Sequence, residues 1–192
     1  MENEIKNQVI SFASSADWEE WLRSYHQIER VIWLRLAKKA SGIVTVTYDE
    51  ALDVALCYGW IDGQKKTEDA DHFLQRFTPR TPGSIWSKRN VAKVLSLIQE
   101  GRMQPAGLVE VESAKQDGRW QAAYDSPKDM TIPEDFLLAV RQDKETEAFF
   151  TTLNRANLYA IGWRLHTAKT PATRARRFAA LLEMLKNGEK LH

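Results

Sequence analysis

Residues 60–78 read WIDGQKKTEDADHFLQRFT, and this stretch decides the fold. Trp60–Thr67 and His72–Thr78 read as two strands. The residues between them, 68–71, are mostly acidic and suit a turn. Two strand segments joined by a short polar turn predict an antiparallel β-hairpin.

Successive side chains of a strand point to opposite faces, and this predicts which of them share a face of the hairpin. On the first strand, strict alternation places four residues together: Trp60, Asp62, Gln64 and Lys66. On the second strand, Phe73 and Phe77 share the face that we expect to pack against helices, and Arg76 lies on the other face. If the register brings Asp62 and Arg76 opposite or diagonal to each other, they form an ion pair beside the tryptophan.

Two capping boxes upstream of the hairpin predict helix starts. Residues 14–17 (SSAD) open a short helix that carries its aromatic and apolar residues on one face: Trp18, Trp21, Leu22 and Tyr25. Residues 47–50 (TYDE) open a second helix that stops before Gly59. Between these helices, residues 29–39 alternate with apolar residues on both faces, which predicts a strand covered on both sides.

Helical periodicity dominates the rest of the chain. It predicts helices over residues 85–100 and 105–116 and a series of helices after Pro133, the last of which has Thr170 as its cap. The residues expected on the inner face of that last helix are Ala175, Phe178, Leu182 and Leu185. Residues 119–133 have no clear period and contain prolines, as linkers do.

These elements combine into an α+β fold, with an N-terminal helix–strand–helix–β-hairpin unit and an all-helical C-terminal half. The expected domains are an α+β domain over 1–118, a linker over 119–133 and a helical subdomain over 134–192. The composition agrees with this expectation. Hydrophobic residues make up 43% and charged residues 28% of the 192 residues, as in ordinary globular proteins.

Charge and cysteine content exclude several classes of protein. Basic residues number 27 and acidic residues 26, so the net charge of +1 does not draw the whole chain to nucleic acid or to an anionic membrane. Cys57 is the one cysteine and cannot form an internal disulfide or, with four histidines, a Cys-rich zinc site. We expect no metal and no cofactor. Without a signal-peptide pattern or ~20 consecutive apolar residues, the expected location is cytoplasmic.

Residues that could line a polar pocket lie on the hairpin and in the segment after it: Trp60, Asp62, Arg76, Arg80, Trp86 and Asn90. In this interpretation the arginines bind a polar or anionic ligand and the tryptophans form the walls. The alternative interpretation is an internal ion pair with the tryptophans in the core. Ser84 or Ser87 would cap a helix that begins near Trp86, and the N–H groups there would attract an anion unless this is an ordinary surface cap.

Motifs in two parts of the chain follow one another in a recognisable order: CYGWIDG at 57–63, QRFTPR at 75–80, SIWSKRN at 84–90, GRMQPAGL at 101–108, NLYAI at 157–161, TAK at 167–169 and TRARR at 173–177. In this order and spacing they resemble the YdeI/OmpD-associated family, also called the bacteriocin-protection family, over about residues 12–192. The resemblance implies a link to the cell envelope, to an outer-membrane porin and to resistance against antimicrobial peptides. The absence of an export signal is a departure from that picture.

Function hypotheses of different classes follow. The first is a non-enzymatic stress or antimicrobial-peptide protection protein that binds a small polar or anionic ligand, or a protein partner. The second is a small enzyme with Asp62 as acid or base and with Arg76 and Arg80 as an anion clamp. A third is a nucleic-acid binder that uses residues 72–99 and 148–182, which hold five and six basic residues and no acid. We favour the first, because no catalytic or nucleic-acid-binding motif is recognisable.

Overall fold

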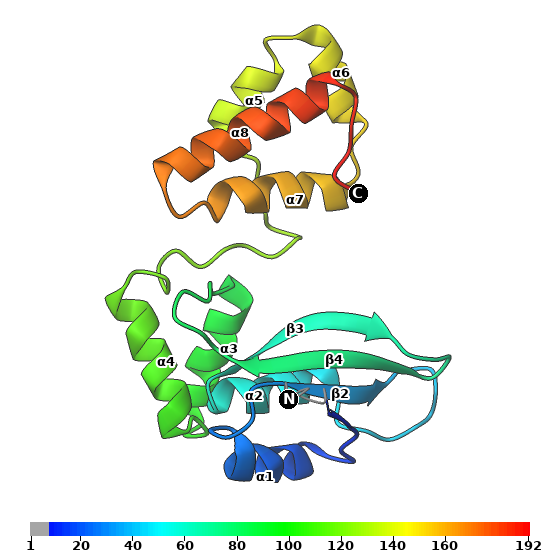
Figure 1. The fold of residues 1–192 in the computed structure, drawn as a ribbon, viewed down its shortest axis with the longest axis vertical. Coiled ribbons are helices and arrows are strands. Elements are labelled where there is room, and N and C mark those ends of the chain that lie inside the picture. Colours follow the sequence, from blue (N-terminus) through cyan, green and yellow to red (C-terminus); the bar gives the residue numbers. More distant parts are fainter. Residues whose placement is uncertain (1–7) are drawn as a thin grey trace, which may run out of the picture. The chain divides into compact units, whose positions relative to one another are not determined.

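The computed structural model describes residues 8–192, so the first seven residues of the predicted N-terminal domain, which also enter the localisation prediction, lie outside it. Within the described range the chain divides into two compact units (Figure 1). The first unit comprises the described part of Met1–Ser84 together with Asn90–Gln121, and the second comprises Ile85–Arg89 and Ala122–His192. The domain limits drawn from the sequence stay a prediction.

A mixed sheet forms the centre of the first unit. Among the described residues, its strands are β1 (Val9–Ile10), β2 (Ile32–Ala37), β3 (Trp60–Thr67) and β4 (His72–Pro79), in the order β1-β2-β4-β3. β1 runs parallel to β2, whereas β4 is antiparallel to both of its neighbours. The predicted hairpin is therefore confirmed, and Figure 1 shows it as the long pair β3 and β4.

A β-bulge in β3 overturns part of the predicted face pattern. Asp62 pairs with Phe77, but the register then shifts and Lys65 pairs with Gln75. Because the bulge inserts extra backbone, Lys65 follows Asp62 on the same face, and Lys66 turns to the opposite face, where its ammonium lies 4.6 Å from the Trp33 ring centroid. The prediction that Lys66 shares a face with Trp60 and Asp62 was wrong for this reason.

The buried Gln75 side chain explains how the bulge is accommodated. Its amide donates hydrogen bonds to the carbonyls of Gly63 at 3.0 Å and Gln64 at 3.3 Å. These carbonyls belong to the two residues between Asp62 and Lys65, where the register of β3 shifts. The Gln75 side chain thus provides a hydrogen-bond donor for the two carbonyls at the bulge.

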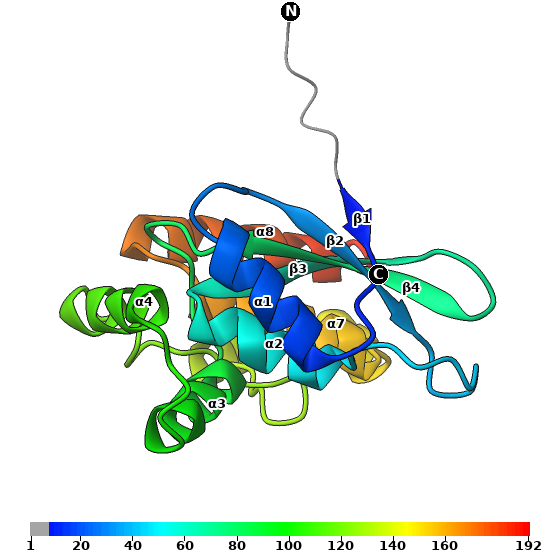
Figure 2. The same ribbon diagram turned by 90° about the horizontal axis from the view of Figure 1, so that it is seen from below.

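Helices α1 (Ser15–Tyr25) and α2 (Tyr48–Cys57) cover one face of this sheet (Figure 2). Both predicted capping boxes are present, at Ser14 and at Thr47. The fully buried Trp18 packs on Phe77, with ring centroids 5.8 Å apart, and its indole N–H donates to the Ala51 carbonyl at 3.0 Å. The phenylalanine face of β4 therefore packs against helices, as its alternation predicts.

Helices α3 (Lys88–Gln99) and α4 (Pro105–Gln116) follow the sheet. α3 begins later than the residue 85 expected from its periodicity. The preceding backbone pairs instead with Tyr124, which donates its N–H to the Trp86 carbonyl at 3.0 Å and accepts from the Lys88 N–H at 2.9 Å. This pairing holds residues 86–88 extended and delays the helix.

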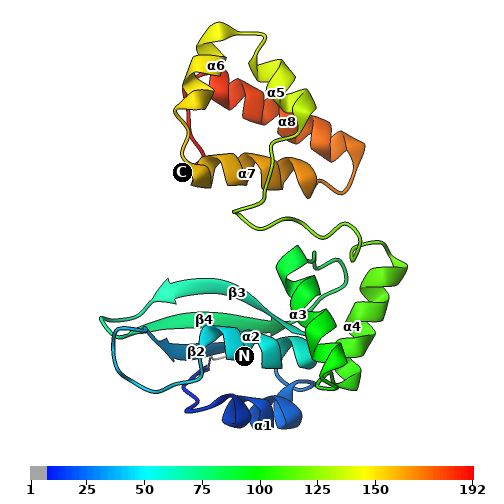
Figure 3. The same cartoon turned by 180° about the vertical axis from the view of Figure 1, so that it is seen from behind.

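The second unit contains α5 (Glu134–Val140), α6 (Lys144–Thr151), α7 (Arg155–His166) and α8 (Pro171–Lys186), shown in Figure 3. Its core consists of buried apolar residues from these helices and the turn after α6: Phe136, Val140, Leu153, Ile161, Leu165, Leu181 and Leu185. Thr170 caps α8 as predicted, but Ala175 is exposed, because the buried stripe of α8 runs through Leu181 and Leu185. The α+β fold class is confirmed.

Candidate functional site

Two of the six predicted pocket residues, Trp60 and Arg80, line one cavity of about 290 Å³ in the first unit. We call it the arginine cavity and define it by six of its lining residues: His26, Arg30, Tyr58, Trp60, Arg80 and Glu110. The lining residues come from four places in the chain: the residues just after α1, the start of β3, the residue after β4, and α4. Residues far apart in the sequence thus meet at one end of the hairpin.

Backbone contacts fix the position of Arg80 in this wall. Its N–H donates to the Gly59 carbonyl at 2.9 Å, and the residue as a whole is 6% exposed. Gly59 adopts φ +75°, and a Cβ there would stand 3.0 Å from the Ala106 carbonyl oxygen. Only glycine satisfies both the left-handed backbone and the close approach of α4, so this turn holds Arg80 against the cavity.

Trp60 and His26 are held by hydrogen bonds at the same wall. Trp60 is 1% exposed, and its indole N–H donates to the His26 carbonyl at 3.2 Å. The His26 Nδ1 lies 2.8 Å from the Leu22 carbonyl, which can only accept, so Nδ1 carries the hydrogen.

The charges at the arginine cavity favour an anion. Arg30 and Arg80 bring positive charge to the lining, against the carboxylate of Glu110. Burial raises the pKa of Tyr58, with a smaller contribution from Glu19, so this phenol stays protonated and can act as a hydrogen-bond donor at neutral pH. The lining therefore combines two basic residues and a protonated tyrosine with one carboxylate.

The other predicted residues do not gather around this cavity. Asp62 accepts a hydrogen bond from the Tyr48 hydroxyl at 2.8 Å, on the helix-covered face of the sheet. Arg76 pairs with Trp33 and so lies on the opposite face, which removes the geometry required for an ion pair with Asp62. Asn90 is buried in α3 of the first unit, whereas Trp86 is buried in the 85–89 segment of the second unit.

A larger cavity of about 720 Å³ was missed by the sequence reasoning. We call it the lysine cavity and define it by six of its lining residues: Lys38, Lys39, Ile43, Tyr48, Lys65 and Phe73. Its lysines stand in two dipeptides, Lys38-Lys39 and Lys65-Lys66, 26 residues apart in the sequence. Each lysine pair is unremarkable alone, and only the pairing of β2 with β4 and of β4 with β3 brings the pairs to the same end of the sheet.

Cys57 lines a third cavity, of about 250 Å³, together with Arg102. Burial raises the pKa of this thiol to about 11, so it is protonated at neutral pH and is a poor nucleophile. Among residues 8–192, no three His, Cys, Asp or Glu side chains are grouped so that they could hold a metal ion. In the same part of the chain, no helix has the length and apolar character needed to cross a bilayer.

Comparison with protein families accounts for both units. Residues 10–110 match a domain of unknown function, DUF8412, and residues 129–188 match the family described as bacteriocin-protection, YdeI or OmpD-associated. The chain belongs to the DUF8412 family, whose model matches more than half of it. The YdeI/OmpD-associated match covers α5–α8 completely, and the predicted resemblance is confirmed there.

The DUF8412 match contains the N-terminal motifs and the candidate sites. The motifs at 57–63, 75–80, 84–90 and 101–108, which the sequence assigns to the YdeI/OmpD-associated family, lie inside this match. All lining residues of the arginine, lysine and Cys57 cavities lie inside it as well. No similar curated protein and no similar solved structure was found for the chain.

Proposed function

We propose that the chain is a non-enzymatic binding protein whose DUF8412 unit takes up a small anionic ligand in the arginine cavity. The observation that carries this proposal is the placement of Arg80, a charged residue that is 6% exposed, in the wall of a cavity that Arg30 also lines. Guanidinium groups match the planar oxygen pairs of carboxylates and phosphates, and such hydrogen bonds gain strength away from bulk water.

The size of the cavity limits the ligand. Ligand sites usually occupy about 300–1,000 Å³, so a cavity of about 290 Å³ suits a molecule of few heavy atoms. Among the described lining residues, Glu110 carries the negative charge, and its carboxylate disfavours ligands with several negative charges. A small monocarboxylate, or inorganic phosphate as its monoanion, fits both the volume and the charge.

The description of the C-terminal family suggests the setting of this binding. A family described as bacteriocin-protection supports a role in stress or antimicrobial-peptide protection, in which the small anion is a signal or a bound metabolite. We keep the cytoplasm as the proposed location. The enzyme hypothesis is less well supported, because Asp62 is held by Tyr48 on the helix-covered face of the sheet and Arg76 lies on the opposite face.

Calorimetric titration of the full chain with phosphate, sulfate, acetate and lactate tests the proposal. We expect one of these anions to bind and Arg30→Gln to weaken its binding at least tenfold. Arg80→Lys should weaken binding more than Arg30→Gln does, since lysine loses the forked donor geometry. Arg164→Gln removes the same charge from an exposed position in α7 and serves as the matched control. The proposal fails if none of the anions binds, or if Arg30→Gln and Arg164→Gln behave alike.

A further inference from the structure

We infer that the lysine cavity is a second binding site, which takes an anion with an apolar body such as a medium-chain fatty acid or an aryl phosphate. The cavity lies where β2 ends, beside the loop after it and the first turn of α2, and against β3 and β4. Its volume of about 720 Å³ is well within the range of sites for drug-sized ligands. It is also separate in its lining residues from the arginine cavity.

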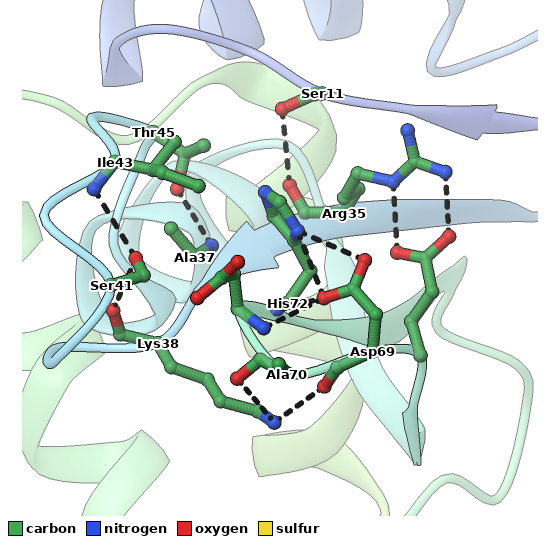
Figure 4. Close-up of polar contacts among 12 residues, drawn as sticks. Ser11, Arg35, Ala37, Lys38, Ser41, Ile43, Thr45, Asp69, Ala70 and His72 are labelled. Atoms are coloured by element: carbon green, nitrogen blue, oxygen red, sulfur yellow. Dashed lines mark hydrogen bonds and ion pairs between the residues drawn. The ribbon is translucent and has the colours of Figure 1, made fainter.

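The charge of the lining selects an anion. Among the described residues, three lysines line the cavity (Lys38, Lys39 and Lys65), against one carboxylate, that of Asp49. The Asp49 carboxylate lies 3.7 Å from the Lys93 ammonium, which offsets its charge. Lys38 donates to the carbonyls of Asp69 at 2.7 Å and Ala70 at 3.1 Å (Figure 4). These acceptors are neutral, so the positive charge of Lys38 is held in place without being cancelled by them.

Apolar side chains next to the charges explain the second half of the specificity. Ala37, Ile43 and Phe73 contribute carbon surface to the lining, and the Lys65 ammonium lies 4.0 Å from the centroid of the Phe73 ring. This cation–π contact places positive charge directly beside an aromatic wall. A ligand that meets both groups carries its acid at one end of an apolar body.

The loop that closes the cavity is already ordered by its own hydrogen bonds. The Ala37 N–H donates to the Thr45 hydroxyl at 2.9 Å, and the Ser41 hydroxyl donates to the Lys38 carbonyl at 2.8 Å (Figure 4). Ser41 also accepts from the Ile43 N–H at 3.2 Å. A preformed wall of this kind lowers the entropic cost of binding.

The first turn of α2 is a poor receptor for an anion, because its capping box already holds a carboxylate. Thr47 and Glu50 form the capping box, in which the Glu50 carboxylate accepts from the Thr47 N–H at 2.9 Å and the Thr47 hydroxyl accepts from the Glu50 N–H at 3.3 Å. The capping box thus satisfies the N–H groups of Thr47 and Glu50 and places a carboxylate at this end of the helix. Recognition of the ligand depends on the lysines.

The bulge in β3 supplies a matched pair of variants for the test. Lys65 lines the cavity, whereas Lys66 lies on the other face of the strand over Trp33. The full chain is titrated calorimetrically with octanoate, phenyl phosphate, acetate and octanol. We expect octanoate or phenyl phosphate to bind at least tenfold more tightly than acetate and octanol, because each of the latter lacks one half of the recognised chemistry.

We expect Lys65→Gln and Lys39→Gln each to weaken this binding at least fivefold, and Lys66→Gln to leave it unchanged. The inference is overturned if neither octanoate nor phenyl phosphate binds, if acetate binds as tightly as they do, or if Lys66→Gln is as harmful as Lys65→Gln. Arg30→Gln should leave octanoate binding intact, which separates this site from the arginine cavity.

Vesicles containing phosphatidylglycerol distinguish the two sources of such an anion. Co-sedimentation with these vesicles, reduced by Lys65→Gln and competed by octanoate, assigns the ligand to a lipid surface, which the exposed Ile43 (45%) and Val44 (81%) of the neighbouring loop would contact. Octanoate binding without co-sedimentation assigns it to a free acid. Co-sedimentation without any binding of the soluble acids contradicts the inference.

Discussion

The Tyr48 hydroxyl donates a 2.8 Å hydrogen bond to Oδ2 of Asp62 and so joins the first turn of α2 to β3. This contact gives a carboxylate on the helix-covered face of the sheet a structural role. It also explains why Asp62, which the sequence suggests as a ligand-binding or acid–base residue, lies outside the linings of the arginine and lysine cavities.

Removal of this contact should destabilise the first unit. A hydrogen bond to a charged group is worth about 1.5–3 kcal/mol, so Asp62→Ala should lower the free energy of unfolding by about 2 kcal/mol and Tyr48→Phe by a similar amount. Urea denaturation of both variants and of the double variant measures their coupling, which we expect to exceed about 1 kcal/mol. An Asp62→Asn variant with unchanged stability but a lost catalytic activity would instead support the enzyme hypothesis.

Gly107 should not tolerate a side chain. A Cβ at this position would stand 2.3 Å from the Cys57 carbonyl oxygen and 2.8 Å from that of Leu56, both backbone atoms at the end of α2. We expect Gly107→Ala to lower the free energy of unfolding by about 2 kcal/mol despite the better helix propensity of alanine. Val109→Ala, at an exposed position of the same helix, should stay within about 0.5 kcal/mol of the wild type in the same urea titration.

Cys57 should react slowly with alkylating reagents in the native chain. Its thiol pKa of about 11, against the ordinary value of 9.0, lowers the thiolate fraction at pH 8 about a hundredfold. Because the unfolded chain loses this proton near pH 9 and the folded chain near 11, the thiol's contribution to stability falls as the pH rises through this interval. Iodoacetamide labelling followed by mass spectrometry measures the rate, and equal rates in buffer and in 6 M guanidinium (about the level that unfolds most domains) would contradict the prediction.

The ion pair between Asp135 and Arg174 should make the second unit sensitive to acid. Arg174 donates to both carboxylate oxygens, at 2.8 and 2.9 Å, which joins α5 to α8 and lowers the pKa of Asp135. A carboxyl whose pKa is lower in the folded chain contributes stability above its unfolded pKa, and this contribution is lost as the pH falls through the folded value.

Thermal unfolding of Arg174→Gln tests this linkage. We expect its Tm to lie below that of the wild type at pH 7 and to approach it at acidic pH, as Asp135 becomes protonated in the folded wild type. Arg176→Gln, at an exposed position of the same helix, should follow the wild type at both pH values. A constant difference between Arg174→Gln and wild type at the two pH values would show that the pair is not the cause.

Local signals explain what could be predicted from the sequence. The capping boxes at Ser14 and Thr47 are complete within four residues, so their helix starts follow from the sequence alone. The hairpin was predictable for the same reason. The bulge in β3 was not, because it is stabilised by Gln75 on the neighbouring strand, and a single inserted residue reverses the faces beyond it.

The candidate sites depend on contacts between distant segments, and they were predicted less well. Trp60 and Arg80, which the sequence groups together, both line the arginine cavity, since the two ends of a hairpin must meet. Their neighbours Arg30 and Glu110 come from outside the hairpin and carry no local signal. The same holds for the lysine cavity, whose basic residues become neighbours only after the β2–β4 register is set.

The pairing of Tyr124 with residues 86 and 88 has an evolutionary consequence. The 85–89 segment belongs to the second unit although 90–121 returns to the first, so the chain passes between the units more than once. A single recombination crossover downstream of residue 121 would transfer α5–α8 to another gene without the strip that pairs with Tyr124. The second unit is therefore complete only when residues 85–89 are transferred together with residues 122–192.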